Sequence, residues 1–285
     1  MPTHLITTTD HVTLHVTIQG KGTPCLYLHG GPGSGSYWMQ KFSAGLLEAH
    51  FTMIYLDQRG VSRSTSPQDH NYSMERMVKD CEEVRAALGI DRWLTMGHSF
   101  GGLLQIGYAL SNPQSIIGMI MLNCGVSLTD CFTLSWMPKA CEFLGINDTT
   151  PYTDAARPVI ERLSDLGRQL RERDLFWKMS YAAQESIAVM NASFGEIPNW
   201  NDDQEEVIMQ YPEYSLDYSA ATATIPVPVL FFYGKTDWMI GPDHYRLAQF
   251  PQMLLWPSDG GHVAILENRL DLETALPAFQ KKYRL

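Results

Sequence analysis

The chain has 285 residues, of which 21 are Lys or Arg and 31 are Asp or Glu, so its formal net charge is −10 at pH 7. An acidic surface repels phosphate, which argues against a nucleic acid or an anionic membrane as a partner. Hydrophobic residues make up 45% of the sequence, which excludes a disordered chain and predicts a globular protein with a substantial core.

The predicted elements alternate between strands and helices along the chain. Residues 12–18 alternate in polarity and predict an early antiparallel strand. Short apolar runs then predict buried strands, each followed by a glycine-rich or polar loop, at residues 25–28, 51–56, 93–96, 116–122, 229–233 and 253–256. Between them, residues 74–88 carry an apolar stripe at helical spacing, with Ser73 as N-cap and Gly89 as stop. This order predicts an α/β fold, a mostly parallel sheet with helices on both faces.

Residues 127–223 break this rhythm, because they are helix-like and contain no buried-strand run. We expect them to form an inserted helical lid over a core made of residues 1–126 and 224–285. Ligands bind at the carboxyl ends of parallel strands, so the lid would enclose a pocket there. The acidic cluster at residues 202–206 is interpreted as a solvated helix start. The aromatic residues expected to contribute to the pocket are Phe132, Trp136, Phe143, Trp177, Tyr181, Phe194 and Trp200.

Cysteine usage and the chain start favour a cytoplasmic protein without a metal or disulfide framework. The five cysteines are odd in number, and no two have C-x-x-C spacing. The first residues lack the basic and apolar regions of a secretory signal. The longest apolar runs, residues 116–122 and 227–233, are too short to cross a bilayer.

The G-H-S-F-G sequence at residues 97–101 matches the G-x-S-x-G nucleophile elbow. That motif needs a sharp turn from a strand to a helix, with small residues flanking the serine so that the backbone can approach closely. A predicted strand at 93–96 precedes the motif and a predicted helix at 102–110 follows it. Ser99 is therefore predicted to be a nucleophile.

A serine nucleophile needs a base, and the base needs an acid that orients it. On this architecture the chain order is serine, acid, histidine, which selects Asp237 and His262, each in a loop after a predicted strand. His244 is a rival base, but we expect it on the surface of a helix at 242–250. Asn123 ends the strand at 116–122, where an acid could lie, and is not acidic.

Acyl transfer also needs donors for the developing oxyanion. One is the backbone N–H that follows the nucleophile, at Phe100. The other is expected from the H-G-G-P-G loop at residues 29–33, where Gly31 is the candidate because Pro32 has no N–H. His29 and His98 lie inside these motifs and are interpreted as structural.

Three motifs together resemble the proline iminopeptidase branch of the α/β-hydrolase superfamily: H-G-G-P-G at 29–33, D-Q-R-G-V-S-R-S at 57–64 and G-H-S-F-G-G at 97–102. The resemblance extends over the whole length, lid included. It implies a cofactor-free and metal-free serine aminopeptidase that releases an N-terminal proline or another small or apolar residue from short peptides. Arg59, in the D-Q-R-G motif, is interpreted as a structural tie between loops.

The same resemblance implies that a lid carboxylate binds the substrate amine. The lid stretch Met190-Asn191 followed by Glu196 makes Glu196 the candidate, with Glu185 and Glu213 as weaker rivals. Gly30, beside Gly31, and Trp238, beside Asp237, are also expected to contact the substrate. Some members of the branch have an acidic residue where this chain has Trp238, and many proline-specific members have G-G-S-W-G where it has G-H-S-F-G.

These departures leave other functions open. A hydrolase of small apolar esters or amides is the main alternative, motivated by Trp238 and the aromatic lid. Epoxide hydrolase and haloalkane dehalogenase relatives place an aspartate where this chain has Ser99. A non-catalytic ligand-binding protein is the remote alternative, and it has no need to retain Ser99, Asp237 and His262 together. The sequence does not indicate an oligomeric state.

Overall fold

A computed structural model describes residues 3–43, 45–193 and 195–285. Its described part contains an eight-stranded sheet in the order β1-β2-β4-β3-β5-β6-β7-β8. β1 and β2 are antiparallel to their neighbours, and the strands from β4 to β8 are mutually parallel. The strands are β1 Thr3–Thr7, β2 Thr13–Gly20, β3 Thr23–Leu28, β4 Phe51–Leu56, β5 Trp93–His98, β6 Ile116–Leu122, β7 Val229–Gly234 and β8 Met253–Ser258.

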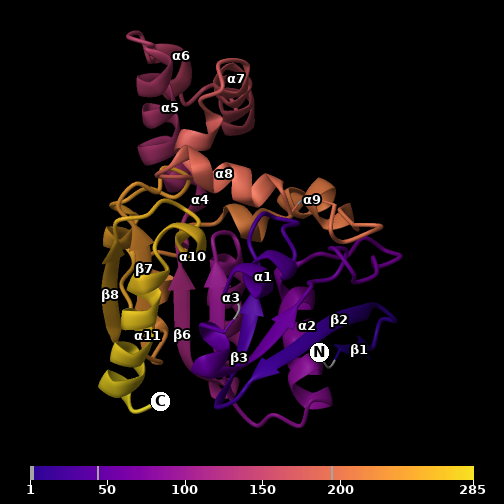
Figure 1. Ribbon diagram of the computed structural model, residues 1–285. Helices are drawn as coiled ribbons and strands as arrows, with labels where there is room; N and C mark the ends of the chain where they lie inside the picture. The colour runs from indigo at the N-terminus through magenta and orange to yellow at the C-terminus, as the bar shows by residue number, and fades with distance from the viewer. Residues whose placement is uncertain (1–2, 44, 194) are drawn as a thin grey trace.

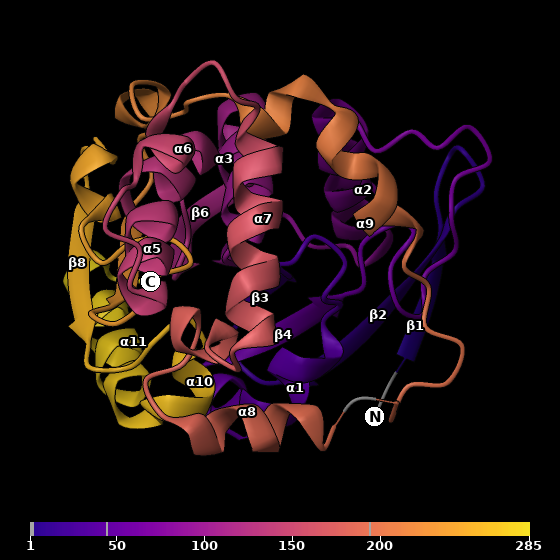
Figure 2. The ribbon, with the colours of Figure 1, turned by 90° about the horizontal axis from the view of Figure 1, so that it is seen from above.

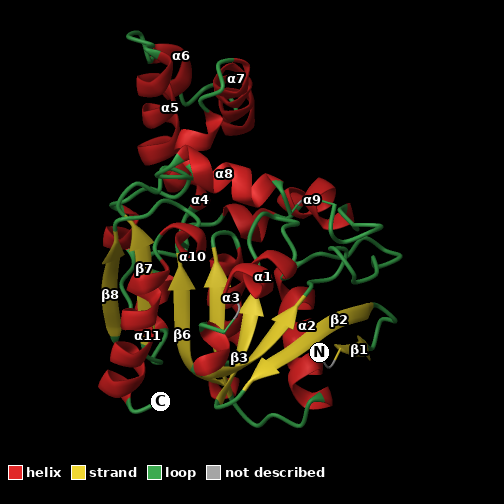
Figure 3. Cartoon of the chain, in the orientation of Figure 1, coloured by secondary structure: helices red, strands yellow, loops and turns green. Residues whose placement is uncertain are grey.

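Every strand predicted from the sequence is present, and β1 is the strand that the sequence reading missed. It lies at an edge of the sheet and is mostly exposed, so it lacks the apolar run by which buried strands are recognised. The predicted α/β architecture, a mostly parallel sheet with helices on both faces, is confirmed (Figure 3).

The helices cover both faces of the sheet (Figure 1). α2 begins as predicted, because Ser73 Oγ accepts the Arg76 N–H at 3.3 Å. The helices are α1 Tyr37–Ser43, α2 Met74–Ala87, α3 Gly101–Ser111, α4 Leu128–Asp130, α5 Met137–Leu144, α6 Thr150–Thr153, α7 Val159–Glu172, α8 Gln184–Asn191, α9 Asp203–Val207, α10 Ala264–Glu267 and α11 Arg269–Tyr283. Each of these helices in the described part of the chain is too short or too polar to span a membrane.

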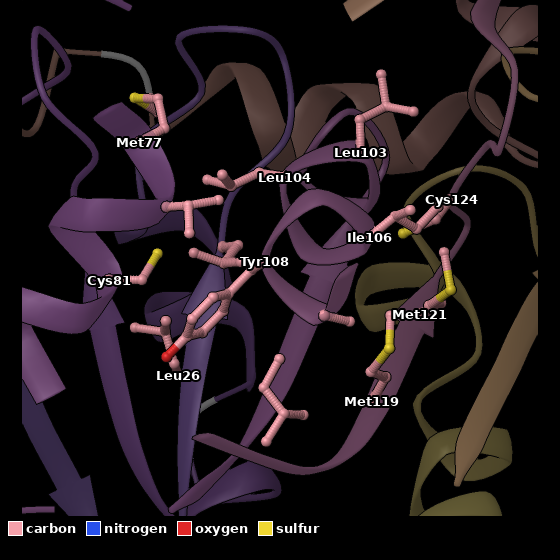
Figure 4. Packing of buried hydrophobic residues seen from close by; sticks show 14 of the residues in the cluster. Leu26, Met77, Cys81, Leu103, Leu104, Ile106, Tyr108, Met119, Met121 and Cys124 are labelled. Carbon is pink, nitrogen blue, oxygen red and sulfur yellow. The ribbon is translucent and has the colours of Figure 1, made fainter. Parts of the chain in front are cut away.

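Alternation along the strands builds one core on each face of the sheet. In β3, Leu26 and Leu28 pack with the side chains of α2 and α3, whereas Cys25 and Tyr27 pack on the opposite face with those of α1 and α11. Figure 4 shows the first of these cores, where Leu103, Leu104 and Ile106 of α3 lie among strand side chains. The first core fixes the helix that begins at the elbow, α3.

The described residues of the segment between β6 and β7 form helices and loops, with an isolated β-bridge from Asn201 to Ser62. α4 to α9 belong to it, and they lie beyond the carboxyl ends of the parallel strands (Figure 1). Seen from above, α7 crosses over the middle of the sheet, and α5, α8 and α9 lie around it (Figure 2). A third apolar cluster, which includes Trp136, Leu166 and Met179, packs within this segment.

The predicted surface helix at 242–250 is wrong. Only the short 3₁₀ helix His244–Leu247 forms there, and His244 is buried. Its Nε2 accepts the Val126 N–H at 2.8 Å, and burial lowers the pKa of His244 to about 4. The imidazole is satisfied by the backbone after β6, which sequence spacing does not reveal.

Gly101, at the start of α3, is packed against the backbone of β3. A Cβ at this position would lie 2.2 Å from the Leu28 carbonyl oxygen. Gly101→Ala is therefore expected to destabilise the protein by about 1–3 kcal/mol, because backbone atoms must shift to admit the methyl group. Gly167→Ala is the matched control: its Cβ would meet nothing closer than Arg171 at 3.5 Å, and alanine favours a helix interior by about 0.5–1 kcal/mol. Urea denaturation of both variants measures the two effects, and equal stabilities would contradict the packing argument.

Candidate active site

Ser99 stands at the turn between β5 and α3. Its backbone is in the left-handed region, with φ of 53°, an uncommon conformation for serine that the surrounding structure must maintain. The Ser99 N–H donates to the Leu122 carbonyl of β6 at 3.1 Å. The strand–turn–helix context expected for a nucleophile elbow is therefore present.

The three residues predicted to form a triad lie together in the structure. His262 Nε2 is 2.8 Å from Ser99 Oγ, and His262 Nδ1 is 3.0 Å from Asp237 Oδ2. Because the Asp237 carboxylate accepts hydrogen bonds, the Nδ1 proton faces it and Nε2 is free to accept the Ser99 hydroxyl proton. The three residues follow β5, β7 and β8, so the parallel sheet brings them to one edge.

The Asp237 carboxylate is buried and accepts four hydrogen bonds. Oδ1 accepts the N–H groups of Met239 at 3.0 Å and Ile240 at 3.1 Å, and Oδ2 accepts Asn123 Nδ2 at 2.9 Å in addition to His262. Burial favours the neutral acid, but the charge of His262 and these hydrogen bonds outweigh it and hold the pKa of Asp237 below its usual range. The carboxylate is therefore ionised at neutral pH.

Contacts from the core and from the helical segment together fix the loop that carries His262. The His262 N–H donates to the Ser180 carbonyl at 2.7 Å, and His98 Nε2 donates to the His262 carbonyl at 2.9 Å. Glu267 accepts the N–H groups of Gly261 and of Ala182, both at 2.8 Å. Burial, followed by the charge of His262, lowers the pKa of His98 to about 4, so His98 is a neutral structural group, as expected.

The two predicted oxyanion donors differ in their surroundings. Gly31 lines the cavity with φ of 112°, a conformation that glycine adopts readily. The Phe100 ring packs on the Tyr214 ring, with 5.2 Å between their centroids. The backbone of Phe100 forms the N-cap of α3. Among the described residues, no acceptor is hydrogen-bonded to the backbone N–H of Gly31 or Phe100. Both N–H groups are therefore available to another acceptor.

A cavity of about 850 Å³ opens onto Ser99 and His262. Its wall is largely apolar, and the Trp38 and Trp200 rings stack there with centroids 6.0 Å apart. Asp202 and Glu205 also line it. No hydrogen bond or ion pair with another described side chain occupies either carboxylate. The cavity thus combines an apolar wall, two available carboxylates and the Ser99 hydroxyl.

The predicted substrate-binding residues are engaged in contacts of their own. Glu196 pairs with Lys41 Nζ at 2.5 Å and accepts a hydrogen bond from the Tyr37 hydroxyl. These contacts lower the pKa of Glu196, with the Lys41 hydrogen bond as the largest cause. Neither Glu196 nor Trp238 is among the described residues that line the cavity. Trp238 lies under Lys139, whose Nζ is 4.1 Å from the ring centroid. Gly30 packs against the elbow, where a Cβ would lie 2.9 Å from Ser99 Cβ.

Some of the other lid candidates line the cavity and others do not. Of the predicted lid aromatics, Tyr181 and Trp200 line the cavity, and Phe194 lies outside the described residues. Glu213 accepts the Met74 N–H at the start of α2 at 2.9 Å, and Glu185 is exposed on α8. The cluster at 202–206 is a solvated helix start, as interpreted, because α9 begins at Asp203 and Asp202, Glu205 and Glu206 are exposed. Asp202 and Glu205 also line the cavity.

The D-Q-R-G motif stabilises the loops next to the site through ion pairs and hydrogen bonds. Arg59 is buried and pairs with Asp80 at 2.6 Å and Asp10 at 2.9 Å, which agrees with the structural role expected for it. Asp57 accepts the Ser36 N–H at 2.8 Å and Arg63 Nε at 2.6 Å. These bonds anchor the loop that contains Gly31.

Comparison with known proteins agrees with this fold. The α/β hydrolase fold family matches residues 23–269. A proline iminopeptidase from Xylella fastidiosa is 30% identical over 171 residues, which are 58% of this chain and 53% of that protein. The chain matches about a third to a half of the length of its curated relatives.

Two solved structures cover nearly the whole chain. A proline iminopeptidase-related protein from Thermus thermophilus has a TM-score of 0.79 at 20% identity, covering 99% of this chain and 98% of the other. An esterase from Exiguobacterium antarcticum has a TM-score of 0.70 at 18% identity, covering 97% and 98%. At these identities the similarity shows the fold. By its sequence match and its architecture, the chain is a member of the α/β hydrolase fold family.

Proposed function

We propose that this protein is a serine hydrolase, with Ser99 as nucleophile, His262 as general base and acid, and Asp237 as the orienting carboxylate. The observation that carries the proposal is the hydrogen-bonded series from Ser99 through His262 to Asp237 at the wall of a cavity. Geometry of this kind defines the Ser-His-Asp arrangement independently of sequence position.

The proposed cycle follows from these contacts. Ser99 Oγ bonds to the substrate carbonyl carbon while its proton passes to His262 Nε2, and the backbone N–H groups of Gly31 and Phe100 stabilise the oxyanion. The bond to the leaving group then breaks as His262 returns the proton to the leaving nitrogen or oxygen. Water attacks the acyl-enzyme, giving a proton to His262, and the ester to Ser99 breaks as that proton returns to Oγ.

We further propose that the substrate carries a free amine next to the scissile carbonyl, as in the N-terminal residue of a short peptide. Asp202 and Glu205 support this, because a desolvated ammonium needs carboxylate partners and these two have none of their own in the described structure. They replace Glu196, which Lys41 and Tyr37 already engage. An apolar wall beside them suits proline or another small apolar residue.

The aminopeptidase proposal is tested by blocking the amine. Turnover of prolyl and other aminoacyl naphthylamides is compared with that of acetyl-prolyl naphthylamide. The free amine is expected to raise kcat/KM by tenfold or more, since hydrogen bonds to charged groups contribute about 1.5–3 kcal/mol. Equal kcat/KM values for the blocked and free substrates would exclude an aminopeptidase.

The double variant Asp202→Asn/Glu205→Gln tests the two carboxylates directly. We expect KM for an aminoacyl naphthylamide to rise about tenfold or more, while the KM of the acetylated compound changes little. Glu206→Gln is the matched control, since Glu206 is exposed and is not among the described lining residues. The Glu196→Gln variant distinguishes the predictions, because a selective KM increase in it alone would return the amine site to Glu196.

An esterase is the second candidate, favoured by the apolar lining of the cavity around Met39, Phe42 and Leu272. The solved esterase with the same fold adds to this alternative. Hydrolysis of short-chain nitrophenyl esters with no detectable turnover of any aminoacyl amide would favour the esterase. Hydrolysis of these esters far more slowly than aminoacyl amides would exclude it.

We also propose that residues 127–223 act as a lid on a core of residues 1–126 and 224–285, in a cytoplasmic protein. The position of α8 and α9 beyond the strand ends supports the lid. Its contribution of Ser180, Trp200 and Glu205 to the cavity wall supports a role in substrate selection.

A further inference from the structure

We infer that Asn123 is a positioning residue for the proposed hydrolase, holding Asp237 and the His262 loop in the geometry that lets His262 accept the Ser99 proton. The inference rests on the proposed function and adds a fourth residue to it. Neither the elbow motif nor the family similarity assigns a role to this position.

The contacts of the Asn123 side chain join both partners of the proposed base. Nδ2 donates to Asp237 Oδ2 at 2.9 Å and to the Gly261 carbonyl at 3.1 Å. Oδ2 is the same oxygen that receives His262 Nδ1, and Gly261 immediately precedes His262. One amide group therefore sets both the acid and the loop that carries the base.

The backbone of Asn123 is fixed for this task. Its N–H donates to the Phe232 carbonyl of β7 at 2.9 Å, and its φ is 51°. Asparagine is one of the few residues besides glycine that adopts this left-handed conformation readily. The residue is 1% exposed and contributes to the inner lining of the cavity.

The chemistry of the neighbours selects an amide rather than an acid. Both contacted atoms, a carboxylate oxygen and a carbonyl oxygen, only accept hydrogen bonds, so the group between them must donate twice. Asn123 Oδ1 is buried without a hydrogen-bond partner in the described structure, an unfavourable arrangement for stability alone. A buried orphan acceptor beside two well-made donor bonds indicates that the donor function is the one retained.

The first test is Asn123→Leu, which keeps the approximate size of the side chain and removes both donors. Because leucine adopts a φ of 51° less readily than asparagine, its kinetics are compared only in protein shown to be folded by thermal unfolding. We expect kcat to fall about 10- to 100-fold, because small displacements of a catalytic group have effects of this size, while KM changes less than about threefold. Thr222→Val is the matched control. Thr222 is equally buried, and its hydroxyl donates to Ser219 O and accepts the Gln249 N–H, so the control loses stability while its kcat stays at the wild-type value.

The second test is Asn123→Asp, which makes the donor dependent on pH. A protonated carboxyl at this position can make one of the two donations, to Asp237, whereas an ionised one repels Asp237. We expect partial activity at low pH and a new loss at higher pH, so that the kcat/KM profile becomes bell-shaped. A residue with only a structural role would not produce this rescue by protons.

Other titratable groups near Asp237 and His262 do not produce a new loss of activity at higher pH. His98 and His244 are held neutral, because burial lowers the pKa of each to about 4. Burial raises the pKa of the Cys124 and Cys131 thiols far above neutrality. Glu267, which accepts the Gly261 N–H, is present in both wild type and variant, so it cannot account for a difference between their pH profiles.

The outcomes separate this inference from the proposed function. If wild type is inactive and Ser99 is not labelled by a fluorophosphonate, the proposed hydrolase and this inference both fail. If wild type is active but folded Asn123→Leu keeps kcat within about twofold, only the positioning role is overturned. Should Asn123→Leu fail to fold, Asn123→Asp decides: a new high-pH limb supports the role, and an unchanged pH profile rejects it.

Discussion

Replacing Ser99 by alanine is expected to abolish turnover of every substrate that the wild-type protein hydrolyses. The variant has no oxygen at the position 2.8 Å from His262 Nε2, so no acyl-enzyme can form. In enzymes of this type the loss in kcat is about a million-fold, and what remains comes from oxyanion and substrate binding. Folding stability is expected to change little, because alanine and serine bear the same cost in the left-handed conformation at this position.

The measurement combines steady-state kinetics with active-site labelling. A fluorophosphonate probe is expected to label the wild-type protein and not Ser99→Ala, and thermal unfolding confirms that both are folded. Ser164→Ala, a change on an exposed turn of α7, is expected to keep both labelling and turnover. If Ser99→Ala retained more than about one per cent of the wild-type rate, another group would be the nucleophile.

The sequence predicts the sheet well because buried strands carry local signals. Runs such as Ile116–Leu122 and Val229–Gly234 are apolar, short and followed by polar loops, and their alternation with helices leaves few possible topologies. The triad candidates follow from the same logic, since chain order and strand ends select Ser99, Asp237 and His262. These predictions depend on the backbone of the core, which local patterns describe.

The sequence is a weaker guide to which side chains of residues 127–223 face the cavity. Whether a lid carboxylate faces a cavity depends on which core cation it meets, and the sequence does not show that Lys41 and Tyr37 engage Glu196. Asp202 and Glu205 are exposed residues, so hydrophobic patterning could not separate a cavity-facing carboxylate from a solvated one. His244 illustrates the same limit, because its burial depends on a distant partner, the Val126 N–H.

Asp237→Asn is expected to lower kcat about 10⁴-fold, more than the removal of one charge would explain. All four hydrogen bonds to the Asp237 carboxylate come from donors: the Met239 and Ile240 N–H groups at Oδ1, and Asn123 and His262 at Oδ2. An asparagine amide offers one acceptor and one donor group. Whichever way it turns, its NH₂ meets a pair of donors.

Each orientation of the new amide has its own cost. If the NH₂ replaces Oδ1, two buried backbone N–H groups lose their acceptor, and the free energy of unfolding falls by about 1–3 kcal/mol for each of them. If the NH₂ replaces Oδ2, His262 Nδ1 must become the acceptor. The ring proton then moves to Nε2, which can no longer accept the Ser99 proton.

Kinetics and denaturation together distinguish these orientations. A large loss of kcat with near wild-type stability indicates the wrong His262 tautomer, whereas a loss of stability with a smaller loss of kcat indicates unpaired N–H groups at Oδ1. Either result supports Asp237 as the orienting acid, because the effect passes through donors that the structure directs at its two oxygens. Met239→Leu keeps the backbone N–H that Oδ1 accepts and serves as a folding control for this loop. A folded Asp237→Asn protein with both near wild-type stability and kcat within about tenfold of wild type would contradict this account, because each orientation of the amide sacrifices either the Oδ1 hydrogen bonds or the correct His262 tautomer.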